Sequence, residues 1–237
     1  MQRIIAILVL FSLSCTYMGG RRVIGNGVFA SKTHNVEGFN NITVSGPIDV
    51  FISQGNDFTV KVEGDENLLE YIEIEEHGDE LEISPKDRYN LRPKAGIKVF
   101  VIAPVFDQLS VAGSGSIKSQ TKITNSNKMQ VNVGGSGDVL IEADAPTITT
   151  NIGGSGSISV KGNTRNFIVH IGGSGEINAF DLLSETTNVN IAGSGDAEIS
   201  ASKELHIKIA GSGDVAYKGN PVVKQNTVGS GNIRKVQ

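Results

Sequence analysis

A Gly-Ser-Gly triplet that recurs along the C-terminal half of the chain constrains the fold more than any other feature. The intervals between successive triplets are 22, 19, 19, 20, 18 and 18 residues. Repeats of this length are typical of solenoids, because one unit cannot bury its apolar face alone and therefore stacks on its neighbours. The first glycines of the seven triplets are Gly113, Gly135, Gly154, Gly173, Gly193, Gly211 and Gly229.

Alternating apolar residues lie on both sides of the triplets, as in "VNVGGSGDVLIEA". Alternation is typical of a strand with one buried face, so Val131 and Val133 are expected to point inward. The same parity places Gly135 and Gly137 on the core side and Asp138 on the outside. A tight corner over a narrow core has no space for a Cβ atom, and glycine also adopts unusual φ and ψ angles. We therefore interpret the triplets as structural bends between strands.

These patterns predict an all-β fold, a single-stranded right-handed parallel β-helix with seven Gly-Ser-Gly coils over residues 109–237. Successive coils would stack ~4.8 Å apart as parallel strands. The 29 glycines disfavour helices, in which glycine is unfavourable. Left-handed hexapeptide helices keep a six-residue rhythm that this chain lacks, which favours the right-handed form. Polar residues in the last coil, such as Thr227 and Arg234, discourage end-to-end stacking of molecules.

The segment 28–108 has a different pattern and is predicted to form an N-terminal mixed-β cap over the open end of the solenoid. "ITVSGPIDVFIS" has the parity of a repeat unit with a shortened bend and is expected to begin the first coil. "EYIEIEEHGDELEIS" predicts an antiparallel hairpin that turns at residues 77–79. "DENLLEY" predicts one helical turn, and "IKVFVIA" predicts a strand.

The first fifteen residues predict export. A short apolar run from Ile4 to Phe11 follows Arg3 and is too short to cross a bilayer, so residues 1–15 resemble a secretory signal peptide. Cys15, the only cysteine, stands where a bacterial lipoprotein is cleaved and acylated. We expect Cys15 to carry the lipid, residues 16–27 to form a tether, and the protein to lie in the cell envelope or outer membrane. The sequence does not indicate which membrane face the protein occupies. The alternative to a lipoprotein signal is an ordinary signal peptide with an incidental cysteine.

An outward column of polar residues stands three positions before the triplets. Amide ladders are common in stacked sheets, because side-chain amides bond along the stack. The functional alternative is a flat polar face that meets a glycan or a protein. The residues of this candidate binding face are Asn132, Asn151, His170, Asn190 and Lys208.

A second outward column, directly after the triplets, is acidic. Carboxylates stacked on adjacent coils repel one another unless they are screened, protonated or bridged by a cation. We interpret this column as a solvated acidic stripe and leave cation binding open. Its members are Asp138, Glu176, Asp196 and Asp214.

Several catalytic and cofactor motifs are excluded. "GSGDVA" fits a dinucleotide pattern, but "YKGNP" follows it where a helix is required. In "GGSGDVLIE" the acid is fifth, whereas the calcium-binding β-roll requires it sixth. Paired carboxylates one coil apart approach the ~5 Å separation of retaining glycosidases, yet these acids are exposed and the chain has no Trp. We therefore expect no enzyme activity and no cofactor.

Metal and nucleic-acid binding are not expected either. His170 has no partner histidine at ligand spacing, and His34, His77 and His206 are isolated as well. The net charge is −4, and Arg21-Arg22 is the only basic cluster. Nucleic acid is therefore excluded as a partner, whereas a homo-oligomer stays open.

The stretch "FNNITVSGPIDVFISQGNDFTVKVEGDENLLEYI", residues 39–72, together with the triplets, resembles the head GIN domain family of putative auto-transporter adhesins, common in Bacteroidetes-type lipoproteins. The resemblance covers residues 28–235 and implies a secreted or surface-anchored β-helical protein without assigned catalytic residues. We expect a lipid-anchored envelope protein that presents a rigid solenoid for adhesion or binding. The alternatives are a structural or assembly component of the envelope and a polysaccharide-acting enzyme.

Overall fold

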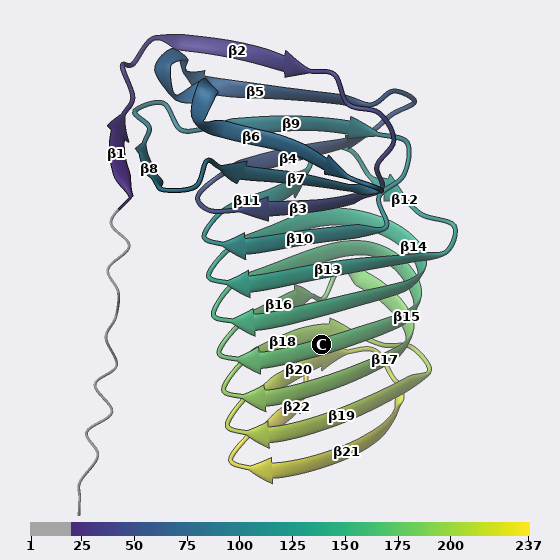
Figure 1. Ribbon diagram of the computed structural model, residues 1–237. Helices are drawn as coiled ribbons and strands as arrows, with labels where there is room; N and C mark the ends of the chain where they lie inside the picture. Colours follow the sequence, from purple (N-terminus) through teal and green to yellow (C-terminus); the bar gives the residue numbers. More distant parts are fainter. Residues whose placement is uncertain (1–19) are drawn as a thin grey trace, which may run out of the picture.

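The computed structural model describes residues 20–237, which form a tall stack of β-strands beneath a smaller cap (Figure 1). The predicted signal peptide and Cys15 lie outside the described residues. Each coil has one strand in a front sheet, which ends at the bend, and one strand in a rear sheet, which follows the bend. As the chain descends in Figure 1, near strands run from right to left and far strands from left to right. The coil is therefore right-handed, and the predicted parallel β-helix is confirmed.

The strands of both sheets are paired in parallel from one coil to the next. From top to bottom, the front sheet contains β3 (Asn41–Ser45), β10 (Gln108–Gly113), β13 (Lys128–Gly135), the later parts of β14 (Asp138–Gly154), β15 (Ser157–Gly173) and β17 (Leu182–Gly193), then β19 (Glu204–Gly211) and β21 (Val222–Gly229). The rear sheet contains β4 (Asp49–Gln54), β11 (Ser116–Ser119), the early parts of β14 and β15, then β16 (Glu176–Ala179), β18 (Asp196–Ser200), β20 (Val215–Lys218) and β22 (Ile233–Lys235). The short strand β12 (Ile123–Thr124) pairs with β14. We number the coils 1 to 8, from β3–β4 to β21–β22.

Inward side chains of the two sheets fill the centre of the stack. The column next to the front-sheet bends is at most 3% exposed in coils 2 to 7 and is aliphatic throughout: Val111, Val133, Ile152, Ile171, Ile191 and Ile209. Burial of each such side chain contributes roughly 1.5–3 kcal/mol. Over coils 2 to 7 the neighbouring column has one polar member, Thr150, which is fully buried and donates a hydrogen bond to the Ile168 carbonyl oxygen at 3.3 Å.

The triplet glycines are required by both conformation and space. The first glycine of every triplet has φ between 121° and 143°, a region that residues with a Cβ atom rarely adopt. The second glycine of the triplet is buried in coils 2 to 7: a Cβ atom on Gly137 would lie 2.6 Å from the Gly115 carbonyl oxygen of the coil above. The obstacle is the adjacent coil as well as the inside of the corner, because coils stack too closely for a side chain at these positions.

Coil 1 lies inside the predicted cap segment, as the parity of "ITVSGPIDVFIS" indicated. β3 pairs with β10 and β4 pairs with β11, both in parallel. The cap elements are β1 (Arg21–Ile24), β2 (Phe29–His34), β5 (Thr59–Asp65), the 3₁₀ helix η1 (Glu66–Tyr71), β6 (Ile72–His77), β7 (Glu80–Pro85), β8 (Tyr89–Arg92) and β9 (Lys98–Ala103). The predicted hairpin, helical turn and strand are thus present as β6–β7, η1 and β9.

The cap closes the top of the stack by changing strand direction. β7 and β9 lie in parallel on β3 and β4, whereas β5 pairs antiparallel with β9 and β2 pairs antiparallel with β5. The chain therefore forms coil 1, builds the cap above it, and returns beneath coil 1 with β10 (Figure 1). Covering the first coil in this way leaves its edge unavailable for pairing with another molecule.

The predicted tether over residues 16–27 needs a correction. Residues Arg21–Ile24 form β1, which pairs in parallel with β8. The Asp65 carboxylate anchors this region, because it accepts hydrogen bonds from the backbone N–H groups of Gly27 at 2.6 Å and Lys94 at 2.8 Å. Part of the segment is thus folded onto the cap, a contact that no local pattern in the sequence indicates.

The lower end of the solenoid is polar, as the last repeat predicted. Val223 is partly buried beneath coil 7, but Gln225 and Thr227, which follow at inward positions of β21, are exposed. Lys235 closes the same end by donating a hydrogen bond to the Asn220 amide oxygen at 2.5 Å. Polar side chains at inward positions disfavour continuation of the stack by a second molecule.

Candidate functional site

The structure brings the five residues of the predicted binding face into one column on the outer surface of the front sheet. Each residue stands directly above the next in adjacent coils of the register. From top to bottom the column reads Asn132, Asn151, His170, Asn190 and Lys208. The rigid stacking of the coils fixes the spacing between these side chains, but the two halves of the column differ in what they contact.

The upper half forms a hydrogen-bonded amide ladder. The side-chain amide of Asn151 donates to Oδ1 of Asn132 at 2.8 Å, and the side-chain amide of Asn132 donates to the Ser110 hydroxyl at 3.1 Å. Gln130 also donates to Asn132, at 3.0 Å. Each neutral hydrogen bond of this kind contributes about 1 kcal/mol to stability. These amides therefore serve the stack, as the structural interpretation of the column predicted.

The lower half lines a hollow. Within residues 20–237, no hydrogen bond joins the side chains of His170, Asn190 and Lys208 to another side chain or to the backbone. They border a hollow of about 430 Å³. A second hollow of about 310 Å³ adjoins it and is also lined by Asn190 and Lys208. Polar groups without partners beside open space are the part of the column available to a ligand.

Small residues form the floor of this hollow, and their role was not predicted. The residue before each triplet points outward, and in coils 5 to 7 it is Gly172, Ala192 or Ala210. Because these side chains are absent or short, the space between the polar column and the bend stays open. These residues have the same outward parity as the polar column. The small side chains beside the column could therefore have been recognised from the alternating pattern of the sequence.

The four acids of the predicted stripe do share one column on the rear sheet. Most of them accept hydrogen bonds from the next coil: Ser157 donates its hydroxyl to Asp138 at 2.6 Å, and the Asp214 N–H donates to Asp196 at 2.8 Å. Asp214 in turn accepts from the Asn232 N–H at 2.8 Å. Ser116, which stands above Asp138 in the same column, is buried and donates its hydroxyl to Asp49 of coil 1 at 2.6 Å.

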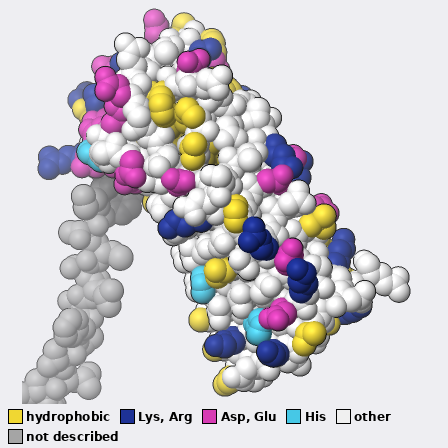
Figure 2. Space-filling view, turned by 90° about the vertical axis from the view of Figure 1, so that its right-hand side faces the viewer, with side chains coloured by type: hydrophobic (Ala, Val, Ile, Leu, Met, Phe, Trp, Pro, Cys, Tyr) yellow, Lys and Arg dark blue, Asp and Glu magenta, His cyan; other side chains and the backbone are white. Residues whose placement is uncertain are grey.

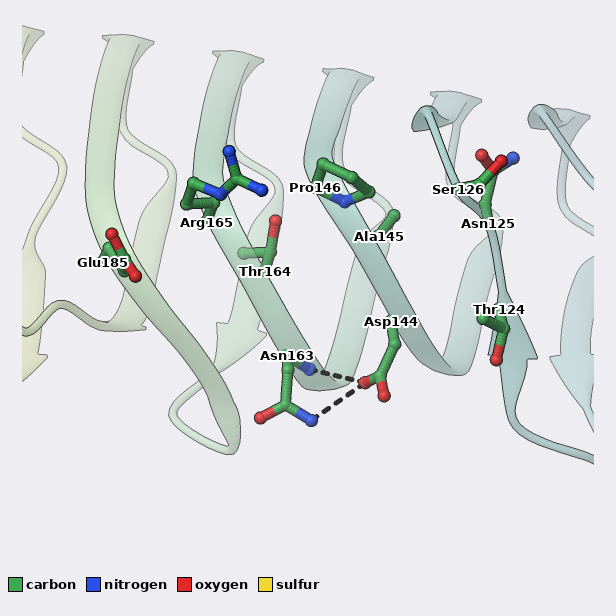
Figure 3. A pocket seen from close by; sticks show the side chains of 10 residues that line it. All are labelled: Thr124, Asn125, Ser126, Asp144, Ala145, Pro146, Asn163, Thr164, Arg165 and Glu185. Carbon is green, nitrogen blue, oxygen red and sulfur yellow. Dashed lines mark hydrogen bonds between the residues drawn. The ribbon is translucent and has the colours of Figure 1, made fainter.

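A further hollow of about 430 Å³ lies where rear strands turn toward the front sheet, and Figure 3 shows the residues that line it. The Asn163 backbone N–H and side-chain amide both donate to Asp144, at 2.9 and 3.0 Å. Burial alone raises the pKa of Asp144, but hydrogen bonds from Lys122 and Asn163, together with the Lys122 charge, hold that pKa below its ordinary value. The carboxylate is thus engaged in joining coils. No local pattern in the sequence indicates this hollow.

The electrostatic character of the surface is mixed. On the face shown in Figure 2, acidic and basic side chains are interspersed along the solenoid, and hydrophobic side chains gather on the cap. Within residues 20–237, no three His, Cys, Asp or Glu side chains form a cluster able to hold a metal ion. Among the same residues, no helix has the length and apolar character needed to cross a membrane.

The family model described as "Putative auto-transporter adhesin, head GIN domain" matches residues 38–221. Because the match spans most of the chain, this protein belongs to the head GIN domain family, as the resemblance indicated. The family and its similar structures are described as adhesins or binding proteins rather than enzymes. A search of curated proteins found no match.

Solved structures with the same fold come from Parabacteroides and Bacteroides species. A crystal structure from Parabacteroides distasonis, described as a putative lipid binding protein, is 31% identical, with a TM-score of 0.77 over 92% of this chain and 100% of that one. A putative adhesin from the same species is 29% identical, with a TM-score of 0.68 over 91% and 100%. A putative adhesin from Bacteroides fragilis, at 20% identity, shares the fold with a TM-score of 0.83 over 90% and 100%.

Proposed function

We propose that this protein is a lipid-anchored protein of the bacterial cell envelope that presents a rigid β-solenoid for binding a glycan or a protein. The observation that carries the proposal is the front-sheet hollow, in which His170, Asn190 and Lys208 stand in register with no hydrogen-bonding partner within the described chain. A binding site needs a few placed polar groups on a preformed surface. The stacked coils supply that surface without a change of shape.

Membership of an adhesin-type family and the similar structures described as adhesins or as a lipid binding protein support a binding role at the surface or envelope. The sequence supports the anchor, since Cys15 follows a short apolar run and small residues. A single acyl chain binds a membrane only marginally, whereas two or more give stable anchoring.

Binding is tested by applying the labelled protein to a glycan array and to envelope or host-surface protein extracts. We expect a ligand that the wild type retains and that Asn190→Ala combined with Lys208→Ala loses. Lys128→Ala, an exposed lysine of the same sheet in coil 3, is the matched control and should keep the ligand. Failure of the wild type on both surfaces, together with a stable homo-oligomer, would instead favour a structural role in the envelope.

The anchor is tested by metabolic labelling with a fatty acid. The wild type should incorporate label and fractionate with membranes, whereas Cys15→Ala should incorporate none and appear in the soluble fraction. Equal labelling of both proteins would remove the lipid anchor from the proposal and leave the binding role in place.

A further inference from the structure

A separate hollow, on the rear sheet, combines an aromatic ring, an exposed aliphatic side chain and polar groups. It has a volume of about 270 Å³ and reaches from coil 3 to coil 6. We call it the rear hollow; the residues used below are Leu140, Ser159, Asn178, Phe180 and Glu198, all among those that line it. It lies on the opposite sheet from the candidate binding face.

Two apolar side chains of the rear hollow, Leu140 and Phe180, are accessible to solvent. Leu140 is 53% exposed on the outer face of the rear sheet. Phe180 lies at the turn after β16 and is half-buried, with the Lys218 ammonium 4.6 Å from the centroid of its ring. Lys218 does not line the hollow, so the cation orients the ring without filling the space beside it.

Three polar side chains of the rear hollow are unpaired, whereas Lys161, which also lines it, forms an ion pair with Glu142 at 3.0 Å. Ser159, Asn178 and Glu198 follow Leu140 in one outward column of adjacent coils. No hydrogen bond joins these three side chains to any other described residue, unlike the acidic stripe beside them, where Ser157 and Asp138 bond across coils at 2.6 Å. A column of polar side chains that does not form a ladder keeps its donors and acceptors for a ligand.

The same column continues upward with apolar groups. Phe51 of coil 1 stacks on Phe100 of the cap, with 5.3 Å between ring centroids, and Lys118 of coil 2 lies 5.9 Å from the centroid of the Phe51 ring. In this column Phe51 stands on coil 1 and Leu140 on coil 3, whereas Phe180 lies outside the column, in the turn two residues after Asn178 on coil 5. Alternate coils are ~9.6 Å apart, which is twice the strand separation.

This arrangement fits a sugar polymer better than other extended ligands. Sugar rings have an apolar face that stacks on aromatic and aliphatic groups and hydroxyls at the rim that bond to amides and carboxylates. In a linear glycan with alternating ring orientation, every second sugar presents the same face. An extended peptide repeats every ~6.6–6.8 Å, which does not match alternate coils, and an acyl chain has no groups to bond with Asn178 or Glu198.

We propose that the rear hollow is a subsite for a linear glycan that lies along the solenoid axis, with a sugar ring on Phe180 and its hydroxyls bonded to Asn178 and Glu198. This proposal rests on the proposed binding function and assigns the glycan to the rear sheet. No Phe or Tyr lines the front hollow, so the aromatic contact is specific to this site.

The test applies the full chain to a printed array of α- and β-linked linear glycans of two to six sugars, followed by calorimetric titration of the best ligand. Affinity should rise with glycan length and then level off. Phe180→Ala should weaken binding about tenfold, the loss expected for an aromatic contact, and Phe180→Tyr should retain it. Glu198→Ala, at a partly buried position, is a second variant that should also weaken binding, and unchanged thermal midpoints serve as the folding control for both variants.

Lys208→Ala separates the two hollows, because Lys208 lines only the front one: the variant should lose the ligand of the front hollow and still bind the linear glycan through the rear hollow. Loss of glycan binding in Lys208→Ala with full binding in Phe180→Ala and Glu198→Ala would overturn the rear subsite and keep the binding function. A wild type that retains no linear glycan would also overturn the subsite. The binding function would then depend on the protein extracts alone.

Discussion

Gly135 lies directly beneath Gly113 in the front sheet, and a Cβ atom on Gly135 would fall 2.7 Å from the Gly113 carbonyl oxygen. The same relationship joins the first glycines of successive triplets down the stack, because a Cβ atom on each would fall against the carbonyl oxygen of the glycine in the coil above. Backbone atoms cannot move aside as a side-chain tip can. The triplet therefore repeats because each coil imposes the same requirement on the next.

Gly154→Ala tests this requirement. The residue combines φ of 143° with a Cβ position that overlaps the Gly135 carbonyl oxygen, so we expect a loss of about 3 kcal/mol in the free energy of unfolding. Gly153→Ala is the matched control, because a Cβ atom there meets nothing within 4 Å, and its change should stay within about 0.5 kcal/mol. Urea or thermal unfolding measures both, and similar losses in the two variants would contradict the explanation.

Thr150 is a core position at which a substitution is expected to raise the stability of the protein. Its buried hydroxyl makes one long hydrogen bond, to the Ile168 carbonyl oxygen at 3.3 Å, in a column whose neighbours are Val131 and Val169. Thr150→Val replaces a poorly satisfied hydroxyl by a methyl group of similar size, so we expect a gain of about 1 kcal/mol. Val169→Thr, one coil below, should lose roughly 1–3 kcal/mol. Destabilisation by Thr150→Val would show that the hydroxyl is needed.

The repeat made the solenoid predictable, because period and parity are local properties of the sequence. Parity alone placed Val131 inside, Asp138 outside and coil 1 at "ITVSGPIDVFIS". Non-local contacts were not predictable in the same way. The pairing of β7 and β9 with β3 and β4 joins segments separated by the whole cap, and the donors to Asp65 come from Gly27 and Lys94 on different loops.

The site was predictable only in outline. The register of Asn190 and Lys208 followed from the repeat, but their availability depends on the short side chains of Ala192 and Ala210 beside them. The rear hollow could not be predicted from the alternation of apolar residues, because Phe180 lies in an irregular turn outside that pattern. Hollows arise where side chains are missing or displaced, and a pattern of strands alone does not report them.

The polar column allows stability and binding to be separated within one row of residues. Asn132 exchanges hydrogen bonds with Asn151, Ser110 and Gln130, so Asn132→Ala should lower the free energy of unfolding by about 1–2 kcal/mol. Asn190→Ala removes a side chain with no partner in the described chain and should leave stability unchanged. Asn132→Ala should still retain the front-sheet ligand, whereas Asn190→Ala should lose it. Equal stability losses in the two variants would show that the column is structural along its whole length.

The Asp65 carboxylate holds the cap together in its charged form, so acid is expected to weaken the cap. Burial on its own raises the pKa of this carboxyl group, but hydrogen bonds from the backbone N–H groups of Lys94, Gly27 and Ala95 outweigh burial and lower the pKa below the ordinary value of 3.8. A carboxyl group with a lowered pKa binds its proton more weakly in the folded state than in the unfolded state. Its contribution to stability is therefore complete above the unfolded pKa and is lost as the pH falls through the folded pKa.

We therefore expect Asp65→Asn to lower the thermal midpoint at pH 7 by at least a few degrees, with a smaller difference from the wild type at pH 2–3. Asp57→Asn changes an exposed carboxyl group of the same cap and should have little effect at either pH. Circular dichroism at both pH values gives the midpoints, and hydrogen exchange at β1 and β8 should show faster opening in Asp65→Asn. A difference between Asp65→Asn and the wild type that stays constant from pH 7 to pH 2 would mean that the Asp65 charge does not stabilise the cap.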